Sequence, residues 1–170
     1  VQCIAFGTGI REGTPELPAM LFCDGILGGF PHSKLFTVVR EQHGLAYFSD
    51  TSSNTWRGLI IATSGISDAD REEVERLVVG QVEAMKKGDI SDKEMESTRM
   101  GLVRRLMTEG DSQTALVMRS LSREILGGIA TPQALADAIL TVTKEDVVKV
   151  ASQMELKAVY TLRAKEDAIG

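Results

Sequence analysis

The stretch Ile26–Tyr47, ILGGFPHSKLFTVVREQHGLAY, sets the organisation of the chain. Its residues predict the end of one helix, a break at Gly28 and Gly29, a second short helix and the start of a strand. Glycine is expected to end a helix here because it adopts the left-handed αL conformation without steric cost. Arg40 then closes the second helix, and Tyr47 opens the strand seven residues later. Two side chains at such a helix–strand junction can point into one cleft, an arrangement suited to holding a peptide.

The residues before this stretch are expected to supply a strand and the first part of a helix. Val1–Phe6 (VQCIAF) alternates apolar and polar residues, a period of two that is typical of strands. Thr14 is a suitable N-cap, and the helix is predicted to run from Pro15 or Pro18 to Leu27. Proline is accepted in the first turn, where its missing N–H has no partner to lose.

A second helix and a hairpin are predicted next. Ser33 is expected to cap a helix from Lys34 to about Glu41, with Gly44 as its stop. Two strand-like runs then follow one another, Ala46–Ser53 and Leu59–Ser64, and together they predict a β-hairpin. The second run, which contains LIIA, is almost continuously apolar, which indicates a central position in the sheet.

From Ser67 the periodicity becomes helical. Ser67 is expected to cap a helix of about twenty residues, which ends near Gly88 and buries Val74, Leu77, Val78, Val82 and Met85. Ser91 and Glu94 form an S-x-x-E capping box. It opens a helix with Met95, Leu102, Leu106 and Met107 as expected core residues, interrupted at Gly110-Asp111. Further helices are predicted up to Leu126, from Thr131-Pro132 to Leu140, and from Thr143 to Met154, before a last strand, Lys157–Arg163.

This order of elements predicts an α+β fold, with an antiparallel or mixed β-sheet and helices packed on one face. We expect residues 1–170 to form a single domain, because no repeat or linker divides them. The chain begins at Val1 within a predicted strand, so we expect it to be a fragment of a longer protein. Methionines at helical spacing are interpreted as core residues.

Composition excludes several classes of protein. The net charge of −5 and the absence of a basic run argue against a nucleic-acid partner, and no apolar run approaches the ~20 residues of a membrane span. Cys3 and Cys23 lie outside any C-x-x-C pattern and are interpreted as small buried residues in a reducing compartment, the cytoplasm of a bacterium. His32 and His43 have no metal-ligand spacing and are interpreted as loop or surface residues, so no metal site is expected.

The segments LGGFPHSKLF and VREQHGLAY resemble the C-terminal, non-metal domain of insulinase/pitrilysin-type zinc peptidases, relatives of the mitochondrial processing peptidase. The similarity extends over nearly the whole chain. The hairpin with LIIATSGI, the SDKEMESTRMGLVRRL helix, the LGGIATPQ break and the VTKEDVVKVA helix all fall where that domain has its own.

The resemblance implies a domain that encloses a peptide together with a homologous N-terminal domain, or with a zinc-bearing paralogous subunit, in a clamshell chamber. Zinc is implied only for that partner, which carries the motif H-x-x-E-H. Arg40 would hold a carbonyl of the substrate backbone, and Tyr47 would donate a hydrogen bond to the carbonyl oxygen as it becomes an oxyanion. This chain lacks H-x-x-E-H, so these residues alone are not expected to hydrolyse peptides.

Alternatives remain open at this point. The chain fits equally a domain of a catalytically inactive paralogue that acts as a scaffold or binds a peptide or a partner subunit. Arg40 has a structural interpretation, in which it satisfies the last carbonyl groups of its helix, and Tyr47 one as a half-buried strand aromatic. A fragment that exposes the face of its partner domain would also be able to form a homodimer.

Overall fold

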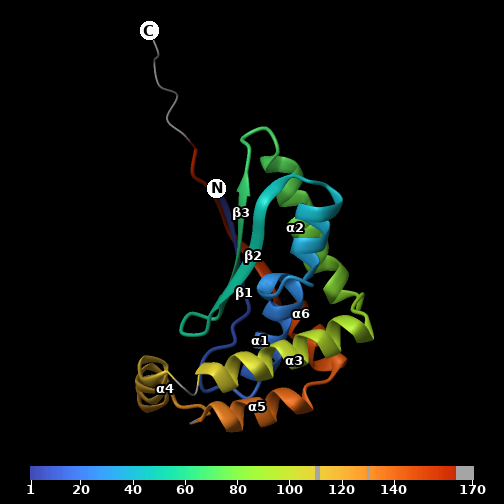
Figure 1. The fold of residues 1–170 in the computed structure, drawn as a ribbon. Coiled ribbons are helices and arrows are strands. Elements are labelled where there is room, and N and C mark those ends of the chain that lie inside the picture. Colours follow the sequence, from blue (N-terminus) through green and yellow to red (C-terminus); the bar gives the residue numbers. More distant parts are fainter. Residues whose placement is uncertain (110–111, 130, 164–170) are drawn as a thin grey trace.

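The computed structural model describes residues 1–109, 112–129 and 131–163. In this part of the chain four strands form one sheet, and each neighbouring pair is antiparallel. The strands are β1 (Gln2–Gly7), β2 (Ala46–Asn54), β3 (Leu59–Ile66) and β4 (Glu155–Thr161), in the spatial order β2-β3-β1-β4. The predicted α+β class is confirmed, and the β2–β3 hairpin places the apolar β3 inside the sheet as expected (Figure 1).

The helices are α1 (Leu17–Asp24), α2 (Arg71–Lys86), α3 (Asp92–Glu109), α4 (Gln113–Leu126), α5 (Pro132–Thr141) and α6 (Lys144–Gln153), with π-helical segments η1 (Gly25–Gly29) and η2 (Phe36–Gln42). All of these except α4 form the helical layer on one face of the sheet (Figure 1). Alternate residues of β1, Ile4 and Phe6, face the helices and are buried. All five residues predicted to form the apolar face of α2 are buried.

Several predicted helix caps are present. The Ser91 hydroxyl accepts the Glu94 N–H at 3.2 Å, while Glu94 Oε2 accepts the Ser91 N–H at 2.7 Å. Thr143 and Asp146 form the same reciprocal box at the start of α6. The Thr131 hydroxyl accepts the Ala134 N–H at the start of α5. Each such cap stabilises its helix by about 1 kcal/mol.

Two predicted caps are wrong. Thr14 donates its hydroxyl to the Arg11 carbonyl in a turn, and α1 begins only at Leu17. Ser67 donates to the Asp70 carboxylate, and α2 begins four residues after Ser67, at Arg71. In both places the short polar side chain makes a hydrogen bond within the turn that precedes the helix, and it does not cap an N–H group of the helix.

The helical conformation ends at the Gly28-Gly29 pair, as predicted, but the predicted left-handed conformation of these glycines is wrong. Neither glycine has a positive φ. The chain continues from α1 directly into η1 and leaves the helical conformation only at Phe30, which is extended. Glycines with a positive φ end helices elsewhere, at Gly44 (φ 64°), which was the predicted stop, and at Gly127 (φ 77°). The interruption predicted at Gly110-Asp111 lies outside the described residues.

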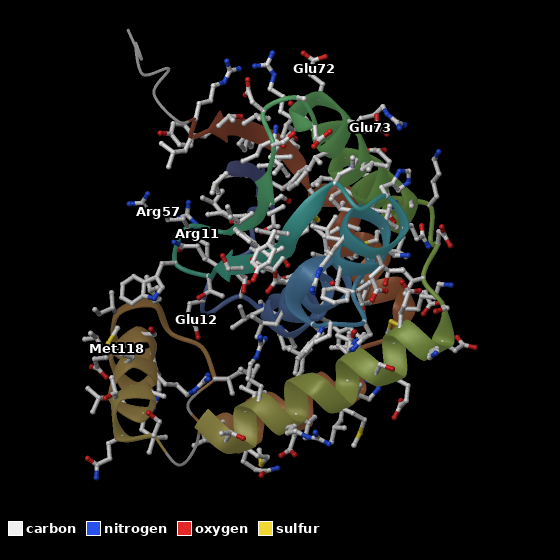
Figure 2. The ribbon with its side chains drawn as sticks, turned by 45° about the horizontal axis from the view of Figure 1, so that its top comes forward. Arg11, Glu12, Arg57, Glu72, Glu73 and Met118 are labelled. Atoms are coloured by element: carbon white, nitrogen blue, oxygen red, sulfur yellow. The ribbon has the colours of Figure 1, made fainter. Side chains whose placement is uncertain are left out.

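Helix α4 stands apart from the other helices (Figure 1). Its apolar residues are exposed, namely Leu116, Val117, Met118, Leu121 and Ile125. Figure 2 places Met118 on this helix, remote from Glu72 and Glu73 at the start of α2. The interpretation of the methionines as core residues is therefore wrong for Met118, and also for the exposed Met100 and Met107.

Among the described residues, no helix combines the length and the apolar character that a membrane span requires.

Candidate functional site

The end of η1 is pressed against strand β2. A Cβ atom on Gly28 would lie 2.5 Å from the backbone nitrogen of Thr51, so only glycine fits at this contact. The Thr51 hydroxyl donates to the Asp24 carbonyl at 3.0 Å, where α1 passes into η1. These contacts fix the Gly-Gly segment beside the strand. Gly28 is thus needed for close packing and not for a left-handed backbone.

Segment η2 follows after a short loop and leads into β2. The Ser33 hydroxyl accepts the Phe36 N–H at 3.4 Å, which agrees with the predicted cap. At the other end, the Gly44 N–H donates to the Arg40 carbonyl at 3.1 Å, and the left-handed Gly44 reverses the chain. The sequence thereby brings the last turn of η2 next to the first residues of β2.

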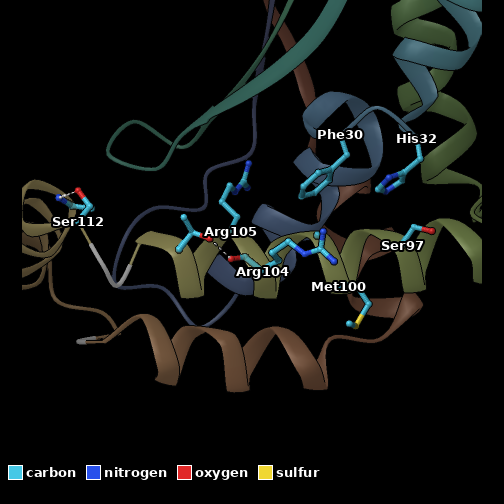
Figure 3. A pocket seen from close by; sticks show the side chains of 10 residues that line it. Phe30, His32, Ser97, Met100, Arg104, Arg105 and Ser112 are labelled. Atoms are coloured by element: carbon cyan, nitrogen blue, oxygen red, sulfur yellow. Dashed lines mark hydrogen bonds between the residues drawn. The ribbon is translucent and has the colours of Figure 1, made fainter.

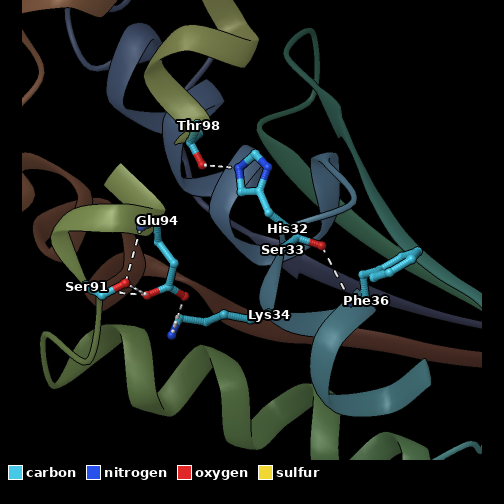
Figure 4. A network of polar contacts seen from close by, with 7 residues as sticks. All are labelled: His32, Ser33, Lys34, Phe36, Ser91, Glu94 and Thr98. Carbon is cyan, nitrogen blue, oxygen red and sulfur yellow. Dashed lines mark hydrogen bonds and ion pairs between the residues drawn. The ribbon is translucent and has the colours of Figure 1, made fainter. Parts of the chain in front are cut away.

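The loop between η1 and η2 is tied to α3 by a polar network (Figure 4). Lys34, only 9% exposed, places its ammonium 2.9 Å from Glu94 Oε1. Burial alone raises the pKa of Glu94, but the Ser91 N–H and hydroxyl and the Lys34 ammonium outweigh burial and hold that pKa below its usual value. The capping box of α3 and the ion pair thus share one carboxylate, which anchors the loop.

His32 belongs to the same network. Its ring stacks on the Phe30 ring, with centroids 5.3 Å apart and an angle of 6° between the planes. Its Nε2 lies 3.1 Å from the Thr98 hydroxyl, and burial lowers the pKa of the imidazole, partly opposed by Glu94. His43 is exposed, as predicted. No group of three His, Cys, Asp or Glu side chains suited to a metal ion occurs among the described residues.

Arg40 lies in the last turn of η2 with its side chain exposed. Its guanidinium lies over the Phe36 ring, 4.6 Å from the ring centroid. Within the described residues it donates no hydrogen bond to a helix carbonyl, so the structural interpretation finds no support. Arg40 instead borders a shallow pocket of about 250 Å³, lined also by Gly28, Gly29, Phe30, Pro31, Phe36, Phe48, Ser49 and Asp50.

Tyr47 is 87% exposed, so the alternative of a half-buried strand aromatic is wrong. Ala46 pairs with Ile66 and Ser49 with Ser64, so β2 carries one extra residue between them, which is a β-bulge. Tyr47 and Phe48 occupy this bulge. Phe48 covers Gly65 on β3, where a Cβ would lie 2.5 Å from the ring, and it lines the Arg40 pocket, whereas Tyr47 does not.

The arrangement can hold an extended chain. Strand β2 is an edge of the sheet, and its outer backbone groups pair with no strand of the described residues. The Arg40 guanidinium and three half-buried phenylalanines, Phe30, Phe36 and Phe48, stand beside that edge. Sequence reasoning missed these aromatic residues. They are three of the five phenylalanines of the chain, all within or next to the Ile26–Tyr47 stretch, and that clustering was the available signal.

The two cysteines are not bonded to each other. Cys23 is fully buried, with its sulfur 3.7 Å from that of Met154, and burial raises the pKa of its thiol far above the usual range. Cys3 is half-buried in β1. Cys23 matches its interpretation as a small core residue, and Cys3 does so only in part.

Comparison with known families gives a match to the family model described as "Peptidase M16 inactive domain", over residues 1–102. The Bacillus subtilis (strain 168) protein "Probable inactive metalloprotease YmfF" is 30% identical over 166 residues, which are 97% of this chain and 39% of that protein.

Similarity to solved structures agrees with this family match. A conserved protein from Enterococcus faecalis V583 superposes with a TM-score of 0.86 at 32% identity, covering 93% of this chain and 37% of that one. A peptidase M16 inactive domain from Pseudomonas fluorescens gives a TM-score of 0.71 at 21% identity, covering 89% and 37%, which shows the fold alone. The chain thus spans about two fifths of the length of these relatives.

Proposed function

The chain belongs to the peptidase M16 inactive-domain family, and on that premise we propose that it is the non-metal half of a zinc-dependent endopeptidase, in which it contacts an extended peptide. The observation that carries this proposal is the unpaired edge of β2 beside Arg40 and its aromatic pocket. The domain would form one wall of a closed chamber, and it would supply binding groups instead of the metal.

A peptide added along β2 would gain main-chain hydrogen bonds from the edge strand. Arg40 would add a planar set of N–H donors for a carbonyl oxygen of that peptide. The Phe36 ring under the guanidinium supports its orientation. Phe30 and Phe48 offer apolar contacts for a substrate side chain next to it.

Tyr47 is proposed to act on the other side of the substrate. Its exposed phenol lies in the bulge at the start of β2, outside the Arg40 pocket. A substrate held by the partner domain would be able to reach it there. A neutral phenol donates a hydrogen bond that strengthens as a carbonyl oxygen becomes an oxyanion. Zinc held by the partner would polarise the same carbonyl.

We propose that residues 1–170 are one domain of a longer protein, and that its partner is a homologous zinc-bearing half or a paralogous subunit. The relatives in the comparison are about two and a half times as long as this chain, which leaves room for such a half. The exposed apolar residues of α4 support a further contact surface, and self-association would cover them in the absence of a partner. The free Cys3 and Cys23 support a reducing, cytoplasmic location.

The test is a binding measurement with a pool of fluorescein-labelled decapeptides of random sequence, followed by fluorescence anisotropy. Arg40→Gln should weaken binding roughly tenfold, the loss expected for a charge-assisted hydrogen bond. Arg57→Gln is the matched control, because Arg57 is also exposed but lies in the turn at the far end of the β2–β3 hairpin (Figure 2). Equal affinity in the Arg40 and Arg57 variants would exclude the proposed contact.

A second candidate is a domain of a catalytically inactive paralogue that serves as a scaffold or binds a peptide or partner. The name of the B. subtilis relative, an inactive metalloprotease, favours it. The zinc content of the protein that contains this domain separates the two candidates. About one zinc ion per chain is expected for a peptidase, and none for an inactive paralogue.

A further inference from the structure

A second pocket, larger than the Arg40 pocket, shares one lining residue with it, Phe30. Its volume is about 750 Å³. Figure 3 shows its walls: the Phe30–His32 loop, one side of α3, and the first turn of α4. Neither arginine of this pocket entered the sequence prediction of the site.

The aromatic wall of this pocket is built into the fold. A Cβ atom on Gly101 would lie 2.8 Å from the Phe30 ring, and a Cβ on Gly25 would lie 3.1 Å from it. Two glycines, one on α3 and one on η1, therefore make the space that the ring occupies. His32 stacks on Phe30 and is held by Thr98, so the wall has a fixed position.

The positive charge of the pocket comes from two arginines on α3. Arg105 places its guanidinium over Phe30, 5.2 Å from the ring centroid, and Arg104 is its exposed neighbour (Figure 3). Arg104 forms no ion pair within the described residues, and none of the described residues that line the pocket is acidic. The first turn of α4, capped by Ser112, adds the partial positive charge of a helix N-terminus. A cationic pocket thus stands on a chain whose net charge is −5.

We propose that this pocket binds a carboxylate of the peptide whose backbone lies along β2, and so gives the domain a preference for acidic peptides. The inference rests on the proposed function, because Phe30 joins the pocket to the Arg40 site. Arg104 and Arg105 are the donors for the carboxylate, and a guanidinium matches its two oxygens in a bidentate pair. Arg105 also interacts with the buried Asp24, so the exposed Arg104 is the main donor. Phe30 and Met100 contact the apolar part of the same residue.

The carboxylate has two sources, an Asp or Glu side chain or the C-terminus of the peptide. Three labelled peptides of otherwise equal sequence distinguish them: one with a Glu-Glu pair and an amidated C-terminus, one with Gln-Gln and an amidated C-terminus, and one with Gln-Gln and a free C-terminus. Anisotropy gives the dissociation constant of each. A peptide with a carboxylate should bind roughly tenfold tighter than the fully amidated Gln-Gln peptide at low salt.

Arg104→Gln is the decisive variant, because Arg104 is exposed and its loss should leave folding intact. It should reduce the preference for the acid to about threefold or less, and Arg104→Glu should abolish it. Lys93→Gln is the matched control: it removes one positive charge from the same helix, about 16 Å away along its axis, and should keep the preference. Arg105→Lys should weaken the preference by losing the fork geometry.

The outcomes separate the two proposals. Arg40→Gln should raise the dissociation constants of the acidic and the amide peptides by the same factor, so that the ratio of the two constants is unchanged. A ratio near one in the wild-type protein, or an acid preference unchanged in Arg104→Gln and Arg104→Glu, would overturn the inference while the Arg40 site stands. If instead Arg40→Gln leaves the affinity for the amide peptide unchanged, the proposed function fails. The inference about acidic peptides then fails with it, because it assumes a peptide backbone bound beside Arg40.

Discussion

The guanidinium carbon of Arg40 lies 4.6 Å from the centroid of the Phe36 ring, one turn earlier on the same π-helical segment. The ring face is electron-rich and attracts the cation, an interaction of about 0.5–1 kcal/mol at an exposed site. The contact holds an otherwise free side chain beside the edge of β2. It also extends the functional proposal to Phe36, whose ring orients the cation.

Phe36→Leu is therefore predicted to lower peptide affinity about two- to fivefold through Arg40. Anisotropy with the random decapeptide pool measures the change. In the background of Arg40→Gln, Phe36→Leu should have little further effect, because the cation it orients is already gone. Additive losses in this double-mutant cycle would show that Phe36 acts independently of Arg40.

Tyr47→Phe is predicted to act on the rate of the assembled peptidase, the state in which the zinc-bearing half is present. A hydrogen bond made only in the transition state lowers kcat, by ~10²-fold or more for an oxyanion donor, and leaves KM nearly unchanged. Steady-state kinetics on a single peptide separates the two constants. An increase in KM at constant kcat would assign Tyr47 to ground-state binding and not to the oxyanion.

Gly28→Ala is predicted to destabilise the domain although the backbone of Gly28 is ordinary. The added Cβ would meet the backbone nitrogen of Thr51 at 2.5 Å, which costs about 1–3 kcal/mol. Gly80→Ala, in α2 with open space around it, should stabilise by about 0.5–1 kcal/mol. Urea denaturation of both variants checks this. Equal stabilities would contradict the packing role given to Gly28.

Glu94→Gln is predicted to cost about 3 kcal/mol, because it leaves Lys34 buried without a counter-ion. Glu96→Gln is the control: Glu96 is exposed and its ion pair with Arg99 is long, at 3.6 Å, so the cost should stay below about 0.5 kcal/mol. The free energy of unfolding in urea at pH 7 gives both values. A similar loss of unfolding free energy in the two variants would show that the Lys34–Glu94 pair does not anchor the loop.

The pH dependence of the Glu94 contribution has a defined sign. The folded pKa of Glu94 is lower than its usual value of 4.5. Its contribution is therefore complete above that value and is lost as the pH falls through the lower, folded pKa. The difference between the wild type and Glu94→Gln should shrink in acid.

Asp24→Asn is predicted to stabilise the domain at neutral pH. Asp24 is 3% exposed, and its Oδ1 has no hydrogen-bond partner within the described residues. Burial raises the pKa of this carboxyl, against the opposing effects of Thr51, Arg105 and Ser53. The amide removes a buried charge, with an expected gain of about 1 kcal/mol at pH 7.

The sign for Asp24 is the reverse of that for Glu94. Because its folded pKa lies above the unfolded value of 3.8, the folded state binds more protons, and the free energy of unfolding falls as the pH rises through this window. The gain from Asp24→Asn should therefore grow from pH 4 to pH 7. A gain that is independent of pH, or a loss at pH 7, would contradict the assignment of a buried, unfavourable carboxylate.

Periodicity and local caps were sufficient to predict most elements of the fold. The apolar positions of α2, the reciprocal box of Ser91 and Glu94, and the continuous apolar run of β3 depend on neighbours in sequence, so the sequence displays them directly. The Gly28-Gly29 pair depends on a contact with Thr51, which is distant in sequence. Its glycines look like a helix stop in either case, and only the tertiary contact distinguishes the two roles.

Two residues of the candidate site were proposed from the sequence, and the others were missed for the same reason. Arg40 and Tyr47 could be selected from their positions at a helix–strand junction. Whether they share one pocket depends on the β-bulge, which turns Phe48 towards Arg40 and leaves Tyr47 outside. The second pocket, lined by Phe30 and Arg104, lies between elements that are about seventy residues apart in the sequence. The Arg-Arg pair on α3 was the one local feature of the sequence that pointed to it.

The most direct test of the central claim is residue-by-residue amide hydrogen exchange with and without the random decapeptide pool at saturation. A peptide that lies along β2 should slow exchange of the outward-facing amides of β2 and leave those of β4, the opposite edge of the sheet, unchanged. At a peptide concentration near the wild-type dissociation constant, the protection should fall strongly in Arg40→Gln, because this variant is expected to bind roughly tenfold more weakly. Protection of β4 instead, or none at either edge while the peptide is bound, would contradict a peptide site at Arg40 and β2.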